Sequence, residues 1–318
     1  SDVCSSDLES VFNQTYSNWE LLISDNGSTD GSKELIESYT SDPRVKALLY
    51  DSNEYLTKRF NQAFEASEGD FISILFGDDY YLPQKIKNQV EAFKELSPEW
   101  GVVHSPGFAL DEFTKIKSDD PATDADGYCL KYLLEEYFTK GYINPISPLV
   151  TRKCFKEYLS YEDLFTESEA IYFRYALKYK FFYLNEPLVV MRKHDKNASW
   201  HSKRNVEIFD ICLERLSKSE ELPKDCHKSL NRFRTTMLNL GAWENIRLSQ
   251  LVDSSYVRNR IYKSIGLDFL QLFIPKNIFI LILTYLPQTI ITMMNGKLDG
   301  NSKKQPYFDD AFIKDKES

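Results

Sequence analysis

The chain has no excess of positive charge, and this excludes one large class of partners. Its 318 residues include 39 lysines and arginines but 48 aspartates and glutamates, which gives a net charge of −9 at pH 7. Surfaces that bind nucleic acids neutralise phosphates with clustered lysine and arginine, and such domains are usually basic. The acidic balance therefore argues against a nucleic-acid-binding protein.

Long apolar runs and patterned cysteines are also missing. No apolar run approaches the roughly 20 residues that a membrane-spanning helix needs. The composition, 42% apolar and 27% charged, is ordinary for a soluble domain. The five cysteines show neither metal-ligand spacing nor the density of a small disulfide-stapled domain. We expect reduced thiols in a cytosolic protein.

Strand-like and helix-like segments alternate over the first part of the chain. Short apolar runs predict strands at residues 19–23, 45–50, 71–76, 100–104, 145–150, 181–184 and 188–191. Helical spacing of apolar residues predicts helices at residues 9–16, 33–39, 56–66, 84–96 and 167–179. Residues 111–127 are polar and acidic, and we expect a flexible loop there. The alternation predicts an α/β fold with a mostly parallel sheet flanked by helices.

From about Ser202 onward only helices are predicted. Their ranges are 206–216, 226–248 and 256–273. Residues 269–294 are rich in Leu, Ile and Phe and are interrupted by prolines, which predicts an amphipathic segment lying in a membrane interface. An ordinary core or oligomer helix is the alternative. We therefore expect an α/β domain over residues 9–200 and a helical extension over residues 201–318.

The most informative stretch runs from Phe71 to Pro83. Six mostly apolar residues predict a buried strand, Gly77 ends it, and Asp78 and Asp79 follow directly. Ligands of open α/β sheets collect beyond the carboxyl ends of the strands. Paired carboxylates there suit a hard divalent cation that bridges to phosphates. The alternative is an ordinary turn whose aspartates cap the helix that begins near Pro83.

A second polar turn, residues 24–32, follows the predicted strand at 19–23. Asp25 stands at the carboxyl end of that strand, and we expect it to face the same crevice as Asp78. The alternative role for Asp25 is a cap or Asx turn before the helix at Lys33. Asp30 suits the capping role better.

Three segments together resemble the family 2 glycosyltransferases, which are inverting enzymes with the GT-A fold. Residues 11–21 resemble the segment between the family's first two strands, residues 25–30 its nucleotide-binding turn, and residues 69–83 its metal-binding Asp-X-Asp region. The likeness covers roughly residues 10–200. It implies a GT-A-like, Rossmann-like domain that binds a nucleotide-sugar and a divalent metal ion.

The beginning of the chain departs from the family. Members begin with a strand and a loop that helps to hold the nucleotide, and nothing before Val11 supplies them. Residues 1–8 read like the translation of a sequencing-adapter oligonucleotide joined to a gene. We expect residues 1–8 to be non-native, a natural flexible terminus being the alternative. We also expect a sheet that lacks its first strand, which leaves the fragment unstable or inactive.

The resemblance implies a donor site built from the two turns. Asp25 and Asn26 would bind the nucleotide, and Asp78 would contact it from the second turn. Asp78 and Asp79 would hold Mg²⁺ or Mn²⁺, which stabilises the diphosphate as a leaving group. Phe76 stands where many members carry their first acidic residue, so one ribose or metal contact is missing.

A later segment, residues 192–199, resembles the end of the family's catalytic domain. By this resemblance, His194 would complete the metal shell or contact the diphosphate, and Arg192 would pair with phosphate oxygens. The alternative for His194 is a surface histidine without a functional role.

An inverting transfer also needs a general base. The family places it in an acidic pair that opens a helix several residues before an arginine. Counting back from Arg174, the pair falls on Glu167 and Ser168, so serine replaces the second acid. Glu167 or Glu169 would serve as the base, with Asp163 nearby. The alternative is that these carboxylates only favour the helix N-terminus.

Taken together, the resemblance implies that the protein is a glycosyltransferase of bacterial surface polysaccharide synthesis. The resemblance implies a UDP-, GDP- or dTDP-sugar donor and a glycan or lipid-linked acceptor. It also implies a cytoplasmic location at the inner face of the plasma membrane. Two alternatives stay open: a non-catalytic nucleotide- or glycan-binding relative, and a nucleotidyltransferase. The second would be expected to carry a glycine-rich, basic phosphate loop, which is not seen in this sequence.

Overall fold

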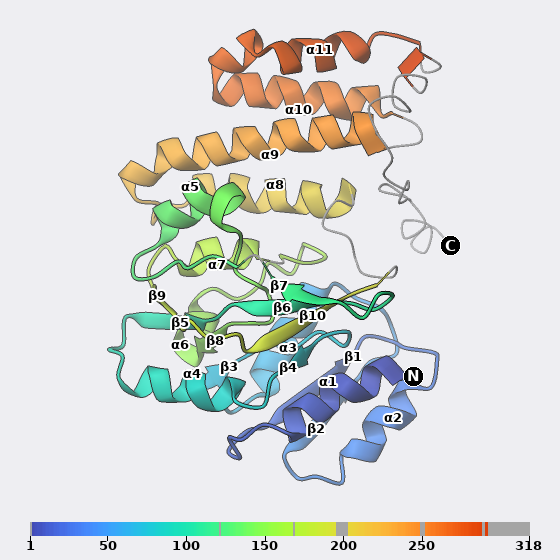
Figure 1. Cartoon of the computed structure of the whole chain (residues 1–318), viewed down its shortest axis with the longest axis vertical. Coiled ribbons are helices and arrows are strands. Elements are labelled where there is room, and N and C mark those ends of the chain that lie inside the picture. The colour runs from blue at the N-terminus through green and yellow to red at the C-terminus, as the bar shows by residue number, and fades with distance from the viewer. Residues whose placement is uncertain are drawn as a thin grey trace. The chain divides into compact units, whose positions relative to one another are not determined.

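The computed structural model describes residues 2–120, 122–167, 169–194, 203–248, 252–287 and 290–291 (Figure 1). The chain divides between residues 197 and 198 into two compact units. The first unit contains strands and helices, and the second contains helices only.

Short strands and helices alternate along the first unit. The strands are β1 (Leu21–Asp25), β2 (Val45–Leu49), β3 (Phe71–Ile72), β4 (Tyr80–Tyr81), β5 (Trp100–His104), β6 (Gly107–Asp111), β7 (Lys117–Asp119), β8 (Leu149–Thr151), β9 (Lys180–Tyr183) and β10 (Val189–Lys193). The helices are α1 (Asp2–Phe12), α2 (Ser32–Tyr39), α3 (Leu56–Ala66), α4 (Lys85–Lys94), α5 (Leu130–Lys140), α6 (Arg152–Glu157) and α7 (Ala170–Tyr175). The predicted α/β class is confirmed.

The strands form three small sheets with mixed pairing. Their orders are β1-β2, β4-β10-β6-β7 and β3-β8-β5-β9. Of the described strand pairs, β1–β2, β6–β10 and β5–β9 are parallel and the other four are antiparallel. The two four-stranded sheets are therefore mixed, and the prediction of a mostly parallel sheet is wrong in this respect. The antiparallel pairing of β4 with β10 brings the segment around residue 79 beside the segment around residue 192.

The predicted strand over residues 71–76 is shorter in the structure. Only Phe71 and Ile72 pair, with β8. Beyond them the hydroxyl of Ser73 donates to the Pro148 carbonyl at 2.9 Å and receives a hydrogen bond from the ammonium of Lys85 at 2.8 Å. These side-chain bonds take the segment out of the ladder. The predicted flexible loop over 111–127 is also partly wrong, because residues 117–119 form β7 against β6.

The core of the first unit lies between the sheets and their covering helices. Val102, Val103 and Phe181 are completely buried. Val90 and Phe93 of α4 pack against Val103 and Leu149 of the sheet. The predicted helix 84–96 and strand 100–104 are thus confirmed, and their apolar faces meet as the helical and strand periods require.

The second unit consists of α8 (Lys203–Ser217), the 3₁₀ helix η1 (Lys224–Cys226), α9 (His227–Leu248), α10 (Ser254–Leu267), the 3₁₀ helix η2 (Phe269–Phe273) and α11 (Pro275–Leu283). The predicted helical extension is confirmed. Helices α9, α10 and α11 run side by side (Figure 1) around a core that includes Ile246, Val257 and Ile280. In the part of the chain that the structure describes, no helix is long and apolar enough to cross a membrane.

Candidate active site

The first predicted binding turn follows β1. Asp25 ends this strand and is buried, and its Oδ2 accepts hydrogen bonds from the main-chain N–H groups of Gly27 at 3.2 Å and Ser28 at 3.0 Å. Gly27 has φ +86°, and a Cβ there would lie 3.0 Å from the main chain of Ser52. Asp25 therefore forms an Asx turn. This turn fixes its carboxylate at the carboxyl end of β1.

Asn26 ties the same turn to α3. Its amide nitrogen donates to Asn53 Oδ1 at 2.9 Å and to the Glu54 carbonyl at 2.8 Å. Its oxygen accepts from the Glu54 N–H at 3.0 Å and from Arg59 Nε at 2.8 Å. These four bonds use both donors and both acceptor positions of the side chain. A nucleotide contact by Asn26 therefore has to replace one of them.

The two adjacent aspartates of the second turn have different surroundings. Asp79 is buried, and its Oδ1 accepts a hydrogen bond of 2.9 Å from the main-chain N–H of Arg192. Burial raises the pKa of Asp79 to about 7. The Asp78 side chain is 33% exposed, and its Oδ2 lies 3.3 Å from Nε2 of His194. The structure thus brings together Asp78 and His194, which the sequence analysis named as metal ligands.

The side chain of Arg192 lies along the main chain of this turn. Its Nε donates to the Asp78 carbonyl and lies 3.9 Å from Oε1 of Glu112. Arg192 is 8% exposed, and its guanidinium stands 6.0 Å from the centre of the Tyr80 ring. The bond to the Asp78 carbonyl uses Nε, and the guanidinium has further N–H donors beyond it.

The side chains of Asp78 and His194 fit a metal ion whose remaining ligands come from the substrate and water. Among the described residues, no group of three or more His, Cys, Asp or Glu side chains could hold a metal ion. Asp78 and His194 offer one carboxylate and one imidazole. Mg²⁺ is commonly held by one or two carboxylates together with water and substrate phosphates. These two residues suit that arrangement.

Glu167 is engaged in a buried ion pair. Both of its carboxylate oxygens accept from Arg174 Nη1, at 2.9 and 3.0 Å, and Oε2 also accepts from the Tyr161 N–H at 3.2 Å. Arg174 donates in addition to the Leu159 carbonyl. Glu167 is 3% exposed. Its neighbour Ser168 lies outside the described residues.

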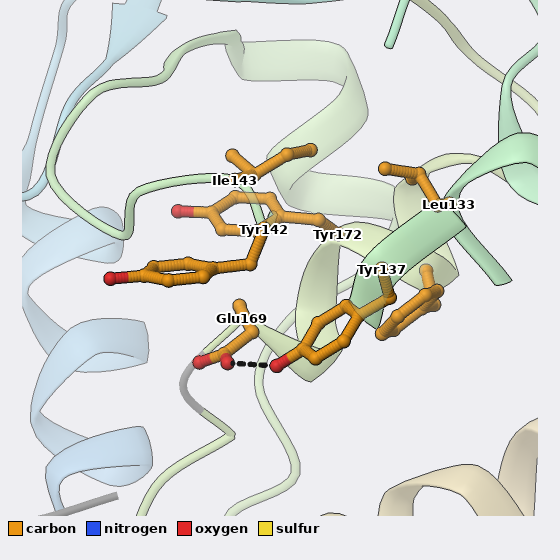
Figure 2. A pocket seen from close by; sticks show the side chains of 7 residues that line it. Leu133, Tyr137, Tyr142, Ile143, Glu169 and Tyr172 are labelled. Atoms are coloured by element: carbon orange, nitrogen blue, oxygen red, sulfur yellow. Dashed lines mark hydrogen bonds between the residues drawn. The ribbon is translucent and has the colours of Figure 1, made fainter. Parts of the chain in front are cut away.

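Glu169 lines a small aromatic cavity (Figure 2). The cavity walls are Leu133, Tyr137, Tyr142, Ile143, Glu169, Tyr172 and Phe173. The Tyr137 hydroxyl donates a hydrogen bond of 2.8 Å to Oε1 of Glu169. The cavity volume is about 10 Å³, which is at the lower limit for one water molecule. Glu169 is therefore held in a nearly dry, aromatic environment.

Tyr142 lines the same cavity as Glu169 and lies close to a further carboxylate, Asp120. Its hydroxyl is 3.5 Å from Oδ1 of Asp120, a buried carboxylate that also accepts from Asn144 at 2.8 Å. Burial, and then the negative charges of Asp120, Glu169 and Asp79, raise the pKa of Tyr142. All three carboxylates thus lie within electrostatic range of one phenol.

Three residues around Glu169 were not predicted as site residues from the sequence: Tyr137, Tyr142 and Asp120. The first lies on α5, which was not predicted, although the apolar spacing of Leu130, Leu133 and Leu134 is helical. Asp120 lies in the expected loop and Tyr142 follows α5, and only tertiary packing brings Tyr142 to Glu169 and Asp120 to Tyr142.

Residues 8–159 match the family model described as glycosyl transferase family 2. The matched range is just under half of the chain, so this part of the chain is similar to family 2 glycosyltransferases. Asp25, Asp78 and Asp79 lie inside the matched residues, whereas Glu169 and His194 lie beyond them. The resemblance found in three short segments is confirmed.

Two curated relatives extend the comparison within family 2. The chain is 33% identical over 108 residues to the putative glycosyltransferase EpsE of Bacillus subtilis, covering 33% of this chain and 38% of the relative. It is 34% identical over 86 residues to WfgD of Escherichia coli, named a UDP-Glc:alpha-D-GlcNAc-diphosphoundecaprenol beta-1,3-glucosyltransferase, covering 27% and 34%. The alignments therefore span about a third of the length of these relatives.

Solved structures match a larger share of the chain. TarS 1–349 of Staphylococcus aureus, in complex with UDP-GlcNAc, has a TM-score of 0.64 at 13% identity and covers 92% of this chain and 87% of that chain. The mannosyltransferase PcManGT of Pyrobaculum calidifontis, in complex with GDP-Man and Mn²⁺, has a TM-score of 0.56 at 13% identity and covers 93% and 81%. These likenesses show the GT-A-type fold.

Proposed function

We propose that this protein is a metal-dependent, inverting family 2 glycosyltransferase of bacterial surface polysaccharide synthesis. It moves a sugar from a nucleoside diphosphate donor to a glycan or lipid-linked acceptor. The observation that carries the proposal is the juxtaposition of Asp78 and His194, at 3.3 Å, beside the buried carboxylate of Asp79. The donor class is supported by WfgD, which is named for UDP-glucose, and by TarS and PcManGT, whose structures hold UDP-GlcNAc and GDP-Man.

Asp78 and His194 would hold Mg²⁺ or Mn²⁺ together with the donor phosphates. The ion would supply charge neutralisation for the diphosphate as it departs. Asp79, fixed by the Arg192 N–H, would contribute negative charge to the metal site from behind Asp78. Asp25 and Asn26 would receive the nucleotide at the carboxyl end of β1, and Arg192 would turn toward the phosphates.

We assign the general base to Glu169 rather than Glu167. Glu167 is neutralised by Arg174, whereas Glu169 has a neutral phenol as its hydrogen-bond donor. The acceptor hydroxyl attacks the anomeric carbon while Glu169 takes its proton, and the bond from that carbon to the phosphate oxygen breaks. The nucleoside diphosphate leaves with the electron pair from the face opposite the attacking hydroxyl, so the configuration inverts.

The test of the donor site is calorimetric binding of UDP and GDP, with Mn²⁺ present and then chelated. We expect metal-dependent binding that Asp78→Ala abolishes and that Asp70→Ala leaves unchanged. Asp70 is an exposed carboxylate next to β3 and serves as the matched control. Binding that survives Asp78→Ala and chelation would exclude this donor site.

Turnover separates this function from the other two classes. Release of UDP or GDP from a nucleotide-sugar, with transfer of the sugar to a lipid-linked or oligosaccharide acceptor, would exclude a non-catalytic binding protein. A nucleotidyltransferase would instead release pyrophosphate from a nucleoside triphosphate. Nucleotide binding without either reaction would favour the non-catalytic relative.

We also propose that residues 269–294 place the enzyme at the cytoplasmic face of the plasma membrane. Of this segment, residues 288–289 and 292–294 lie outside the described residues. Its described part carries large apolar side chains that are exposed to solvent, including Phe269, Phe273 and Ile282. Such exposed surfaces commonly mark protein or membrane contacts.

A further inference from the structure

The helical unit contains a groove between α9 and the segment formed by η2 and the start of α11. Its volume is about 900 Å³. The α9 side contributes a single helix face, with His227, Lys228, Asn231, Arg232, Thr235, Thr236, Asn239 and Leu240. The opposite wall includes Leu270, Gln271, Ile274, Lys276 and Asn277. Nothing in the proposed sugar transfer uses this groove.

The charge of the groove favours an anion. Lys228, Arg232 and Lys276 line it, and the carboxylate that faces them among the lining residues is Asp268. Asp268 is already used to cap η2: its Oδ1 accepts from the Leu270 N–H at 3.1 Å and its Oδ2 from Gln271 at 2.8 Å. The lining cations therefore outnumber the lining carboxylates, and the Asp268 carboxylate already accepts one main-chain N–H and one side-chain amide N–H.

Two polar atoms at the bottom of the groove have no hydrogen-bond partner among the described residues. Thr235 is 4% exposed, and its hydroxyl oxygen is unpaired. Asn239 donates through Nδ2 to Gln271 at 2.9 Å, but its Oδ1 is unpaired. Buried polar atoms are normally paired, so an unpaired hydroxyl beneath a basic groove points to a bound ligand with hydrogen-bonding oxygens.

A second cationic pair lies at the α11 end of the groove. The ammonium of Lys276 stands 4.5 Å from the centre of the Trp243 ring. Burial and the nearby charge of Arg247 lower the pKa of Lys276, and Nε of Arg247 has no hydrogen-bond partner among the described residues. An anion bound in the groove would reduce the repulsion between these two neighbouring cations.

An apolar ridge borders the groove. We define it as the exposed residues Phe269, Leu270, Leu272, Phe273, Ile274, Ile278, Phe279 and Ile282 of η2 and α11. The rings of Phe269 and Phe273 stack edge to face at 5.7 Å. A cationic groove beside an exposed apolar ridge matches the two layers of an anionic bilayer, the charged headgroups and the acyl chains below them.

We propose that this groove binds the phosphate headgroup of an anionic membrane lipid while the apolar ridge enters the membrane interface. The inference rests on the proposed membrane contact of residues 269–294 and names the lipid class and the residues that select it. Lys228 and Arg232 pair with phosphate oxygens from the exposed side of α9. The Thr235 hydroxyl donates to the headgroup from the bottom of the groove.

The test is flotation of the full chain with vesicles of phosphatidylcholine, alone or mixed with phosphatidylglycerol. We expect binding to the anionic vesicles, reduced about 30-fold or more by Lys228→Glu/Arg232→Glu, since each cation near an anionic surface contributes about fivefold. Lys224→Glu/Lys263→Glu makes the same charge change at exposed positions that do not line the groove. This control is expected to bind within about twofold of the unaltered chain.

A second variant tests the groove without changing charge. Thr235→Val keeps the shape of the side chain and removes the unpaired hydroxyl. We expect about tenfold weaker binding to the anionic vesicles, because a hydrogen bond to a charged phosphate is lost. Its unfolding midpoint is expected to stay unchanged or rise. Unaltered lipid binding by Thr235→Val would overturn the assignment of the groove.

Other outcomes separate the inference from the proposals on which it rests. One outcome is binding to both vesicle types that the groove variants leave unchanged and that the ridge variant Phe269→Ser/Phe273→Ser abolishes. This outcome would leave the membrane contact intact but would overturn the headgroup site. No binding to either vesicle overturns both. Calorimetric binding of inorganic phosphate without vesicle binding, or dimerisation abolished by the ridge variant, also overturns the lipid assignment. Nucleotide binding, measured on the same protein, reports on sugar transfer independently.

Discussion

Oε1 of Glu169 lies 2.8 Å from the hydroxyl oxygen of Tyr137, which donates a hydrogen bond to it. Two residues earlier, Glu167 accepts two hydrogen bonds from one nitrogen of Arg174. Both carboxylates are buried. The first-named carboxylate accepts from a neutral phenol and the second from a cation. We therefore expect Glu167 to stabilise the fold, and we propose Glu169 as the group that takes the proton.

Glu169→Gln is expected to lower kcat by about 10²- to 10⁴-fold, the usual contribution of a general base. The KM for the nucleotide-sugar should change little, since Glu169 is assigned to the acceptor side. Steady-state kinetics with a fixed acceptor measures both quantities. Full activity in Glu169→Gln would move the base to another residue.

Tyr137→Phe tests whether Tyr137 positions and tunes that base. A hydrogen bond to a carboxylate favours the charged form, so removing the donor raises the carboxylate pKa. The acid limb of the kcat–pH profile is therefore expected to move to higher pH, while donor binding stays unchanged. A uniform loss of activity at every pH would indicate a structural role only.

Glu167→Gln is expected to destabilise the first unit by about 3–5 kcal/mol, because Arg174 then remains buried without a balancing charge. Replacing both partners, in Glu167→Leu/Arg174→Met, should cost less than the single change. Urea unfolding measures both. Glu65→Gln, at an exposed position, is the control and should stay within about 0.5 kcal/mol of the unaltered chain. A stable but inactive Glu167→Gln would instead favour Glu167 as the base.

Local sequence patterns predicted those helices and strands whose apolar spacing is visible within a few neighbouring residues. The predicted helix 56–66 coincides with α3, and the predicted strand 100–104 coincides with β5. The position of Asp25 at the carboxyl end of β1 was also predictable from turn chemistry, whereas Asp78 stands six residues beyond the end of β3. The proximity of Asp78 and His194 was expected only from the family resemblance, because it depends on the pairing of β4 with β10, which no local pattern reveals.

Long-range packing explains what the sequence did not reveal. The predicted strand over 71–76 pairs only at Phe71 and Ile72; beyond them Ser73 donates to the Pro148 carbonyl and accepts from the Lys85 ammonium, both of which lie elsewhere in the chain. The aromatic cavity around Glu169 depends on tyrosines from α5 and from the segment that follows it. Neither arrangement leaves a periodic signal, since the partners are separated by many residues.

Lys85 is completely buried and should make stability depend on pH. Its ammonium donates to Ser73 Oγ at 2.8 Å and to Gln89 Oε1 at 3.0 Å, and burial lowers its pKa to about 7. Between pH 7 and the ordinary lysine value of 10.5, the unfolded chain binds more protons than the folded one. Its contribution to the free energy of unfolding therefore rises with pH in this window, by up to about 1.4 kcal/mol per pH unit.

Lys85→Met is expected to flatten that rise. Urea unfolding at several values between pH 7 and 10 measures the slope for each variant. Lys87→Met, an exposed position two residues further along α4, provides the matched control and should keep the slope of the unaltered chain. Equal slopes in both variants would mean that Lys85 is not the titrating group.

Replacing Gly241 with a larger residue is expected to destabilise the helical unit because Arg260 lies close to it. A Cβ at Gly241 would lie 2.7 Å from Nε of Arg260, whose guanidinium is fixed by Asp210 and by the carbonyl groups of Met237 and Leu238. The arginine cannot move aside without losing these bonds, so Gly241→Ala should destabilise the helical unit by about 1–3 kcal/mol.

Gly266→Ala provides the opposite expectation in the same unit. Gly266 lies near the end of α10, and a Cβ there meets nothing within 4 Å. Alanine is the better helix former, so this change should stabilise the unit by about 0.5–1 kcal/mol. Thermal unfolding of the two variants compares them directly. If Gly241→Ala lowers the unfolding temperature and Gly266→Ala raises it, the effect at Gly241 is due to the close approach of Arg260. Loss of stability in both would mean that the helices, rather than this contact, respond to the change.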